Sequence, residues 1–299
     1  MSHSWANEIV DRARRLGKMP WRAYLPGRQQ IKQLIIAPNA IVLAHTGRGT
    51  EGGAVHVQHV NAIDGETVTW RDAPNAIKRL LQAHARPGDV VHAVLSDHFV
   101  RYTVLPWHEG VTDPREREAL VRHEFVRRYG AVAESWTLRL ANGPFGTATL
   151  VAAIESELFG ALQATCVAAR IRLARVETFL VHAFNASCDH FAEPNFQFAS
   201  AEPGRVCVAQ IRAGHWHHVH GQRINDAESE GLFAVLAREA MLGGEIDPSW
   251  PTYAHVVKQY GQAPVLGQWG PHGIRPLTSA STTSTESPTA KVVASEVHS

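Results

Sequence analysis

Apolar residues recur along this chain in short runs of strand length near its start. QLIIAPNAIVLAH holds two such runs around Pro38-Asn39, AVHVQHVNAI alternates, and TVTW follows Asp64-Gly65. Apolar runs separated by turn residues are typical of β-hairpins. The pattern therefore predicts a series of hairpins where the folded region begins.

Helical and strand periods then alternate through the middle of the chain. Helices are predicted from Pro74 to Ala85, after Asp113-Pro114, and along the stripe that includes Leu158 and Leu162. Strands are predicted in GDVVHAVLSDHFVRYTVLPW, a second apolar hairpin, and in SWTLRLA, FGTATLVAAI and IRLARVETF. This alternation indicates an α/β fold.

The last part of the chain changes character twice. After a loop around Glu193-Pro194-Asn195, RVCVAQIRAGHWHHVHGQRI predicts a further pair of strands, and GLFAVLAREAML predicts a helix. A closing segment rich in Pro, Gly and Trp follows. Half of the last 22 residues are Ser or Thr, so we expect disorder from about Thr278 onward.

Composition excludes several classes of protein. The 29 basic and 28 acidic residues nearly cancel, which gives no reason to expect nucleic acid as a partner. Three cysteines, Cys166, Cys188 and Cys207, fit a reducing compartment, and no run is long and apolar enough to span a bilayer. We expect a cytoplasmic protein.

The segment from Trp5 to Arg28 carries six basic residues against two acidic ones, with apolar residues at near-helical spacing. A solvated helix on its own domain is the preferred interpretation. The alternative is peripheral association with a membrane surface.

The stretch GHWHHVHG places four histidines within six positions. In a strand, His215 and His217 face one way, while Trp216, His218 and His220 face the other. A His-x-His pair supplies two zinc ligands, but no third is obvious nearby, although Asp226 could fold in. A polar hairpin strand is preferred, and a metal-dependent hydrolase built on His215 and His217 is kept as the weaker alternative.

Familiar nucleotide-binding and catalytic motifs give no better candidate. GRGTEG, residues 47–52, matches GxGxxG, but a strand-like alternation follows it where a phosphate site needs a helix N-terminus. The chain has no GxxxxGK[ST], GxSxG or HExxH. We therefore predict no catalytic, cofactor-binding or metal-binding residue.

The order of these segments resembles the PilM family of type IV pilus assembly proteins and the related cytoplasmic L-type proteins of type II secretion. The resemblance rests on QLIIAPNAIVLAH, on VVHAVLSDHFVRYTVLPW, on EREALVRHEFVRRYG, and on residues 147–186. It implies an actin-like, RNase H-like fold of two related subdomains, in which Glu124 matches a family glutamate and Asn185 the end of a family helix.

The chain departs from the nucleotide-binding pattern of that family. Relatives that bind nucleotide have an Asp followed by Gly in the first hairpin, where this chain has Ala37-Pro38-Asn39-Ala40. Gln210 to Gly214 stands where a second Asp-x-Gly turn belongs, so GHWHHVHG occupies a phosphate-hairpin position, and the closing segment lacks a clear Gly-Gly turn. The resemblance therefore implies a fold without a working nucleotide site, and so no cofactor.

The resemblance implies the following organisation: a basic segment (1–28), a first actin-like subdomain (29–165), a shortened second one (166–277) and a disordered tail (278–299). It implies a cytoplasmic scaffold of a pilus- or secretion-type envelope assembly, held at the inner membrane through the cytoplasmic tail of a membrane partner. The candidate partner surface lies around Phe99, Tyr102 and Trp107, for which ordinary core packing is an equal alternative.

The alternative from another class is an active ATPase or kinase of the same superfamily. It would hold Mg²⁺ through Asp97 or Asp226 and bind ATP between the subdomains. Mg²⁺-dependent nucleotide binding distinguishes it from the scaffold.

Overall fold

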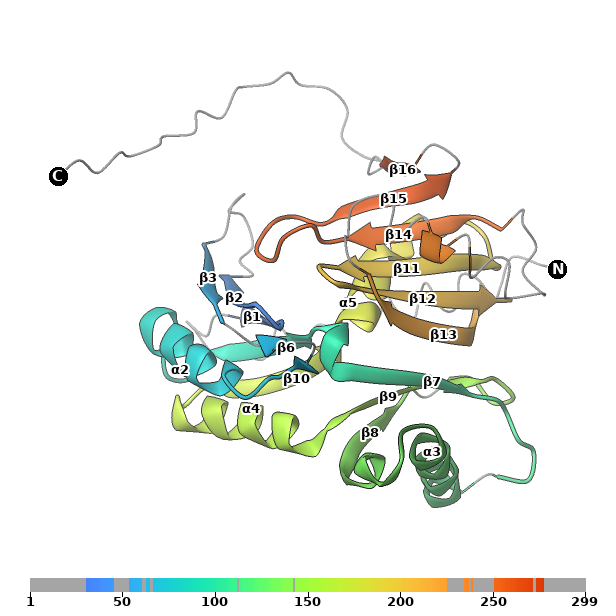
Figure 1. The fold of residues 1–299 in the computed structure, drawn as a ribbon, viewed down its shortest axis with the longest axis horizontal. Helices are drawn as coiled ribbons and strands as arrows, with labels where there is room; N and C mark the ends of the chain where they lie inside the picture. Colours follow the sequence, from blue (N-terminus) through green and yellow to red (C-terminus); the bar gives the residue numbers. More distant parts are fainter. Residues whose placement is uncertain are drawn as a thin grey trace.

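Two main sheets with a helix between them form the body of the protein (Figure 1). The computed structural model describes residues 31–45, 54–60, 63–64, 67–111, 113–141, 143–224, 234–236, 238, 250–270 and 273–276. The predictions for residues 5–28, for GRGTEG, for Asp226 and for the tail from Thr278 lie outside these residues.

The first sheet has the strand order β10-β6-β1-β2-β3. Its strands are β1 (Ile31–Ile36), β2 (Ala40–His45), β3 (Val55–His59), β6 (Val90–Leu95) and β10 (Arg172–Thr178). The first three form an antiparallel meander, whereas β6 pairs parallel with both β1 and β10. The predicted opening hairpins are confirmed, and a short ribbon of β4 (Ile63–Asp64) and β5 (Thr67–Val68) follows β3.

Helices α2 (Ala73–His84) and α4 (Ser156–Ala168) lie side by side against the first sheet (Figure 1). Ile77 and Leu81 of α2 are buried, as are Leu158 and Leu162 of α4. Apolar residues three or four positions apart share one helix face, so this burial explains why the helical period predicted both elements correctly.

A small subdomain is inserted between β6 and α4. Its elements are the 3-10 turns η2 (Asp97–Phe99) and η3 (Ala131–Ser135), strands β7 (Val100–Leu105), β8 (Trp136–Leu140) and β9 (Thr149–Glu155), and helix α3 (Pro114–Tyr129). The strands form an antiparallel sheet in the order β7-β9-β8. Val121 and Phe125 of α3 are buried in its core. The Asp113 side chain accepts a hydrogen bond from the Arg115 amide at 2.8 Å, which caps α3 where the sequence predicted its start.

The second main sheet has the order β13-β12-β11-β14-β15-β16. Its strands are β11 (Phe196–Glu202), β12 (Arg205–Arg212), β13 (His215–Arg223), β14 (Thr252–Val256), β15 (Val265–Gly270) and β16 (Gly273–Pro276). An antiparallel meander, β11-β12-β13, is joined by β14 parallel to its first strand. This arrangement repeats that of β1-β2-β3 and β6, so the protein consists of two related halves.

Helix α5 (Phe179–Ser187) lies between the two sheets (Figure 1). The Phe184 ring packs against Phe198 of β11 at 5.4 Å and against Trp216 of β13 at 4.7 Å between ring centroids. The buried residues around it belong to the same core as β1, β2 and β6. One continuous apolar core therefore joins the two halves.

The boundary predicted at residues 165 and 166 needs correction. It falls inside α4, which packs on the first sheet, and the following strand β10 is an edge strand of that same sheet. Because β10 pairs with β6, the first half extends to about Thr178, and the second half begins after it.

Candidate functional site

The two halves meet where corresponding hairpins turn. The first turn, between β1 and β2, contains Ala37 and Ala40, which are buried, and the Ala37 amide donates to the Ala40 carbonyl at 3.0 Å. The second turn, between β11 and β12, contains Pro203 and Gly204, and Gly204 has φ +81°. Glycine adopts this left-handed conformation without the steric cost that a Cβ would bring.

Asp97 lies at the centre of this junction, directly after β6, and is 1% exposed. Its Oδ1 accepts hydrogen bonds from the Tyr102 hydroxyl at 2.5 Å and from the Leu180 amide at 3.1 Å. Its Oδ2 accepts from the Ser200 hydroxyl at 3.2 Å. Since Leu180 is in the first turn of α5, Asp97 also supplies a carboxylate to that helix N-terminus.

Glu202 approaches the same point from the end of β11 and is also 1% exposed. Its Oε1 accepts hydrogen bonds from the Ser96 hydroxyl at 2.8 Å and the Asp97 amide at 2.6 Å. Its Oε2 accepts from the Tyr260 hydroxyl at 2.9 Å. Ser96 and Asp97 belong to the first half, and Glu202 and Tyr260 to the second, so a buried polar network ties the halves together.

Two carboxyl groups this close and this deeply buried cannot both ionise cheaply. Burial raises the pKa of Asp97, while Tyr102, the Leu180 amide and Arg205 oppose the rise. Burial, and then the charge of Asp97, raises the pKa of Glu202 to about 8. At neutral pH the pair therefore holds a proton, which we assign to Glu202 because the positive charge of Arg205 favours the ionised form of Asp97.

The hydrogen bonds of Asp97 argue against the ATPase alternative, in which Asp97 would be a Mg²⁺ ligand. A hydrated Mg²⁺ needs carboxylate oxygens that water can reach. Both oxygens of Asp97 instead accept hydrogen bonds inside the protein. In this conformation Asp97 is not accessible to a hydrated ion.

The assignment of Gln210 to Gly214 to the second nucleotide hairpin needs correction. Those residues form the end of β12 and its turn into β13. The strand that repeats β1 is β11, so the corresponding turn lies at Glu202 to Arg205. The sequence prediction failed because it placed no strand over FQFASAE and so counted β12 as the first strand of the meander.

The histidine stretch forms most of β13, as the preferred interpretation required, but its two faces differ from the expected alternation. An irregularity pairs Gln210 with His218 and Ile211 with Trp216, which leaves His217 as an extra residue. Trp216 therefore shares the inner face with the buried Val219 and packs on Phe184. Within the described residues, no three His, Cys, Asp or Glu side chains gather as ligands of a metal ion.

The three residues predicted for a partner surface have different environments. Tyr102 is buried, and its hydroxyl belongs to the Asp97 network. Phe99 is half-buried and packs against the main core. Trp107, directly after β7, is half-buried and contacts Phe145, an 85% exposed side chain, with ring centroids 4.5 Å apart.

A rigid turn presents Phe145 to solvent. The amide and the hydroxyl of Thr147 both donate to the Pro144 carbonyl, at 3.3 and 2.7 Å, and Gly146 has φ +81°. Phe145 is the second residue of this four-residue turn and lies at its apex. Gly146 is the third residue, where the turn requires the positive φ that glycine adopts readily. Sequence analysis missed Phe145, although the Gly-Pro-Phe-Gly stretch is a turn signal that places an aromatic residue at a loop tip.

A cavity of about 290 Å³ lies between β7 and α3 of the inserted subdomain. Its lining includes Tyr102 and Thr103 from the strand, and Glu124 and Phe125 from the helix, with two arginines of the last helical turn. Glu124, the residue that matches the family glutamate, pairs with Arg127 at 2.7 Å. The cavity thus combines an aromatic wall with charged groups at its edge.

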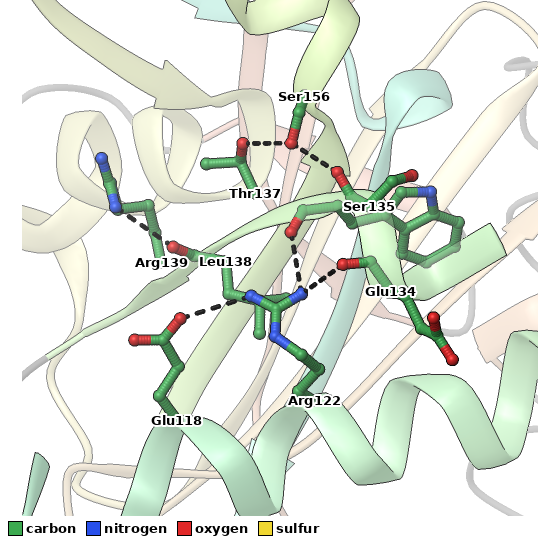
Figure 2. Close-up of polar contacts among 9 residues, drawn as sticks. Glu118, Arg122, Glu134, Ser135, Thr137, Leu138, Arg139 and Ser156 are labelled. Carbon is green, nitrogen blue, oxygen red and sulfur yellow. Dashed lines mark hydrogen bonds and ion pairs between the residues drawn. The ribbon is translucent and has the colours of Figure 1, made fainter. Parts of the chain in front are cut away.

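Polar contacts fix the inserted subdomain in position (Figure 2). The Arg122 guanidinium on α3 donates to the carbonyls of Glu134 and Trp136, at 2.9 and 3.2 Å. Ser156, the first residue of α4, donates to the Ser135 carbonyl and bonds to the Thr137 hydroxyl at 2.7 Å. These contacts connect α3 to β8, and β8 to the start of α4.

Comparison with known structures identifies the fold. The cytoplasmic domain of EpsL, an inner membrane component of the type II secretion system of Vibrio cholerae, is 11% identical with a TM-score of 0.51, covering 79% of this chain and 85% of that one. A Bacteroides thetaiotaomicron protein with an actin-like ATPase fold and unknown function is 10% identical with a TM-score of 0.51, covering 77% and 82%. A PilM-PilN type IV pilus biogenesis complex is 18% identical with a TM-score of 0.49, covering 74% and 67%.

No protein-family model matches the chain, and no curated protein matches it in sequence. The solved structures confirm the predicted actin-like fold of two related halves. No helix of the described residues is long and apolar enough to cross a membrane.

Proposed function

We propose that this protein is an actin-like cytoplasmic scaffold of a pilus- or secretion-type envelope assembly, which binds the cytoplasmic tail of an inner-membrane partner without hydrolysing nucleotide. The observation that carries the proposal is the buried network between the two halves. Ser96 and Asp97 contact Glu202 directly, at the place where the two corresponding hairpins turn toward each other.

The proposal of a scaffold follows from the energetic cost of opening that junction. A nucleotide held between the two turns would have to separate Glu202 from its donors and leave buried polar groups without partners. The EpsL domain is named as part of an inner-membrane secretion assembly, which supports a role of the same class for a chain of the same fold. The chemistry of the junction thus favours a rigid body over a hinged enzyme.

Titration calorimetry with ATP and Mg²⁺ tests this part of the proposal. We expect no Mg²⁺-dependent heat of binding, because the Asp97 carboxylate is enclosed by its three donors. Saturable micromolar binding that requires Mg²⁺ and disappears in Asp97→Asn would overturn the scaffold proposal in favour of the ATPase. Circular dichroism of Asp97→Asn establishes that the variant is folded.

The partner surface is proposed at the end of β7, where the half-buried Trp107 contacts the exposed Phe145; the same strand lines the cavity formed with Phe125. Aromatic side chains contribute large contact areas at low entropic cost, and they dominate many protein interfaces. An extended tail would contact this pair and insert a side chain into the cavity. Tyr102 then lines the cavity, Phe99 packs against the main core, and Trp107 contacts the partner.

Substitution of the aromatic pair tests the location of this surface. With the cytoplasmic tail of an inner-membrane subunit encoded beside this protein as the ligand, Trp107→Ala and Phe145→Ala should each weaken binding about tenfold or more. Val132→Ala is the matched control, since Val132 is an apolar side chain of the same subdomain and is 60% exposed. Equal affinity for all three variants and the parent protein would place the surface elsewhere.

A further inference from the structure

Three arginines from three strands converge beside the turn between β11 and β12. Arg205 begins β12 and pairs in register with Arg223, near the end of β13. Arg101 comes from β7, a strand that lies next to β13 (Figure 1). Like charges directly opposite each other on neighbouring strands destabilise a sheet, so this arrangement needs a compensating interaction.

A chain of contacts connects Arg101 to the other two arginines. Its Nη1 donates to the His98 carbonyl at 3.2 Å, and the His98 ring lies 2.9 Å from the Pro203 carbonyl through Nε2. Pro203 lies two residues before Arg205. The Nη2 of Arg205 lies 3.0 Å from the position that a Cβ on Gly221 would occupy, so its guanidinium extends across β13. The three side chains therefore share one region of the β7 and β13 junction.

Arg205 is 9% exposed, and its Nε is buried with no hydrogen-bond acceptor among the described residues. A buried donor without an acceptor is costly, more so on a charged group. Asp97 is the described carboxylate that interacts electrostatically with Arg205, but its oxygens already accept three other hydrogen bonds. Arg205 thus retains donor capacity that the described residues do not use.

The charges of Arg205 and Arg223 act on Arg101 and on the nearby His98. Burial lowers the pKa of Arg101, and the charges of Arg205 and Arg223 lower it further. Burial brings the pKa of His98 to about 4, and all three arginines act in the same direction. A neutral His98 between three guanidinium groups leaves a local excess of positive charge.

We propose that Arg101, Arg205 and Arg223 form a binding site for a phosphate-type oxyanion. Guanidinium groups pair with phosphate oxygens through two parallel hydrogen bonds, and a divalent tetrahedral anion offers acceptors to several such groups at once. Such an anion accepts hydrogen bonds from the guanidinium groups and offsets the repulsion between Arg205 and Arg223. This site needs no Mg²⁺ and is independent of the partner surface at Trp107.

Thermal unfolding in potassium phosphate, compared with potassium chloride at equal ionic strength, tests the site. Phosphate and pyrophosphate should raise the midpoint of the parent protein, and Arg223→Gln and Arg101→Gln should each weaken the response about tenfold or more in anion concentration. Arg139→Gln is the matched control, because Arg139, like Arg223, is an exposed arginine on a strand, and it should respond like the parent. The absence of a phosphate response, or equal responses in all variants, overturns the proposal.

A second measurement does not depend on ligand affinity. Without phosphate, Arg223→Gln should unfold at a higher temperature than the parent, because it removes the like charge opposite Arg205. Unchanged or lower stability of Arg223→Gln in chloride contradicts the repulsion on which the site rests.

Competition of Mg²⁺-free ATP with phosphate would identify nucleotide phosphates as a source of the anion, and its absence would identify free phosphate.

Discussion

Replacing Glu202 with alanine is expected to lower the free energy of unfolding by about 3–5 kcal/mol. The substitution removes the acceptor for the Ser96 hydroxyl, the Asp97 amide and the Tyr260 hydroxyl. All three donors are buried, so none regains a hydrogen bond to water without a structural change. Urea unfolding followed by circular dichroism measures the loss.

Glu202→Gln is the matched control for this prediction. The amide has nearly the same shape as the protonated carboxyl group: its oxygen accepts from Ser96 and Asp97, and its nitrogen takes the place of the protonated Oε2 beside the Tyr260 hydroxyl. We therefore expect Glu202→Gln to be about as stable as the parent protein at neutral pH. A loss of less than about 1 kcal/mol in Glu202→Ala would contradict the network as the link between the halves.

The two halves could be predicted from sequence to different extents. In the first half, β1 and β2 have large apolar residues at almost every buried position, and the Pro38-Asn39 turn separates them. Large apolar side chains give a strong periodic signal because each of them must be buried. The helices α2, α3 and α4 followed from the same signal, with Pro near the start of the first two.

In the second half, β11 gave almost no signal, although all seven of its residues are buried. Its sequence, FQFASAE, is short of large aliphatic residues and ends in a glutamate. Small residues fit there because both neighbours, β12 and β14, are themselves buried strands. Its polar residues are tolerated only through tertiary hydrogen bonds, which local sequence does not reveal.

The candidate site could not be predicted from the sequence for the same reason. Asp97 and Glu202 are separated by 105 residues, so their contact follows from the fold and not from any local spacing. One signal did exist: Pro38 and Pro203 each follow the first strand of a meander, in the stretches LIIAPNAI and ASAEPGRV, respectively. Aligning the two halves on these prolines would have placed Glu202 beside the first hairpin.

The shared proton of the junction predicts how stability changes with pH. The pKa of Glu202 is about 8 in the folded protein against an ordinary value of 4.5, so the folded state binds more protons than the unfolded chain between these values. Stability from this group is complete below about pH 4.5 and is lost as pH rises toward 8. The loss amounts to about 1.4 kcal/mol per pH unit within that window.

Buried histidines act in the opposite direction at lower pH. Burial lowers the pKa of both His98 and His255 to about 4, so the unfolded chain binds more protons than the folded protein between about pH 4 and 6.5. Stability from these groups rises over that range and offsets the loss from Glu202. At pH 6.5 half of these histidines are still protonated in the unfolded chain, so the effect of Glu202 is fully uncompensated only above about pH 7.5.

We therefore expect the free energy of unfolding to fall by about 1 kcal/mol between pH 6.5 and 8. Urea unfolding at constant ionic strength measures the change, and Glu202→Gln should abolish it because an amide does not titrate. His98→Gln is the contrasting variant: it should alter the pH dependence mainly below about pH 7.5 and leave the decline above that pH intact. A parent protein whose stability is flat from pH 6.5 to 8, or a decline that persists in Glu202→Gln, would show that this carboxyl pair does not hold the proton assigned to it.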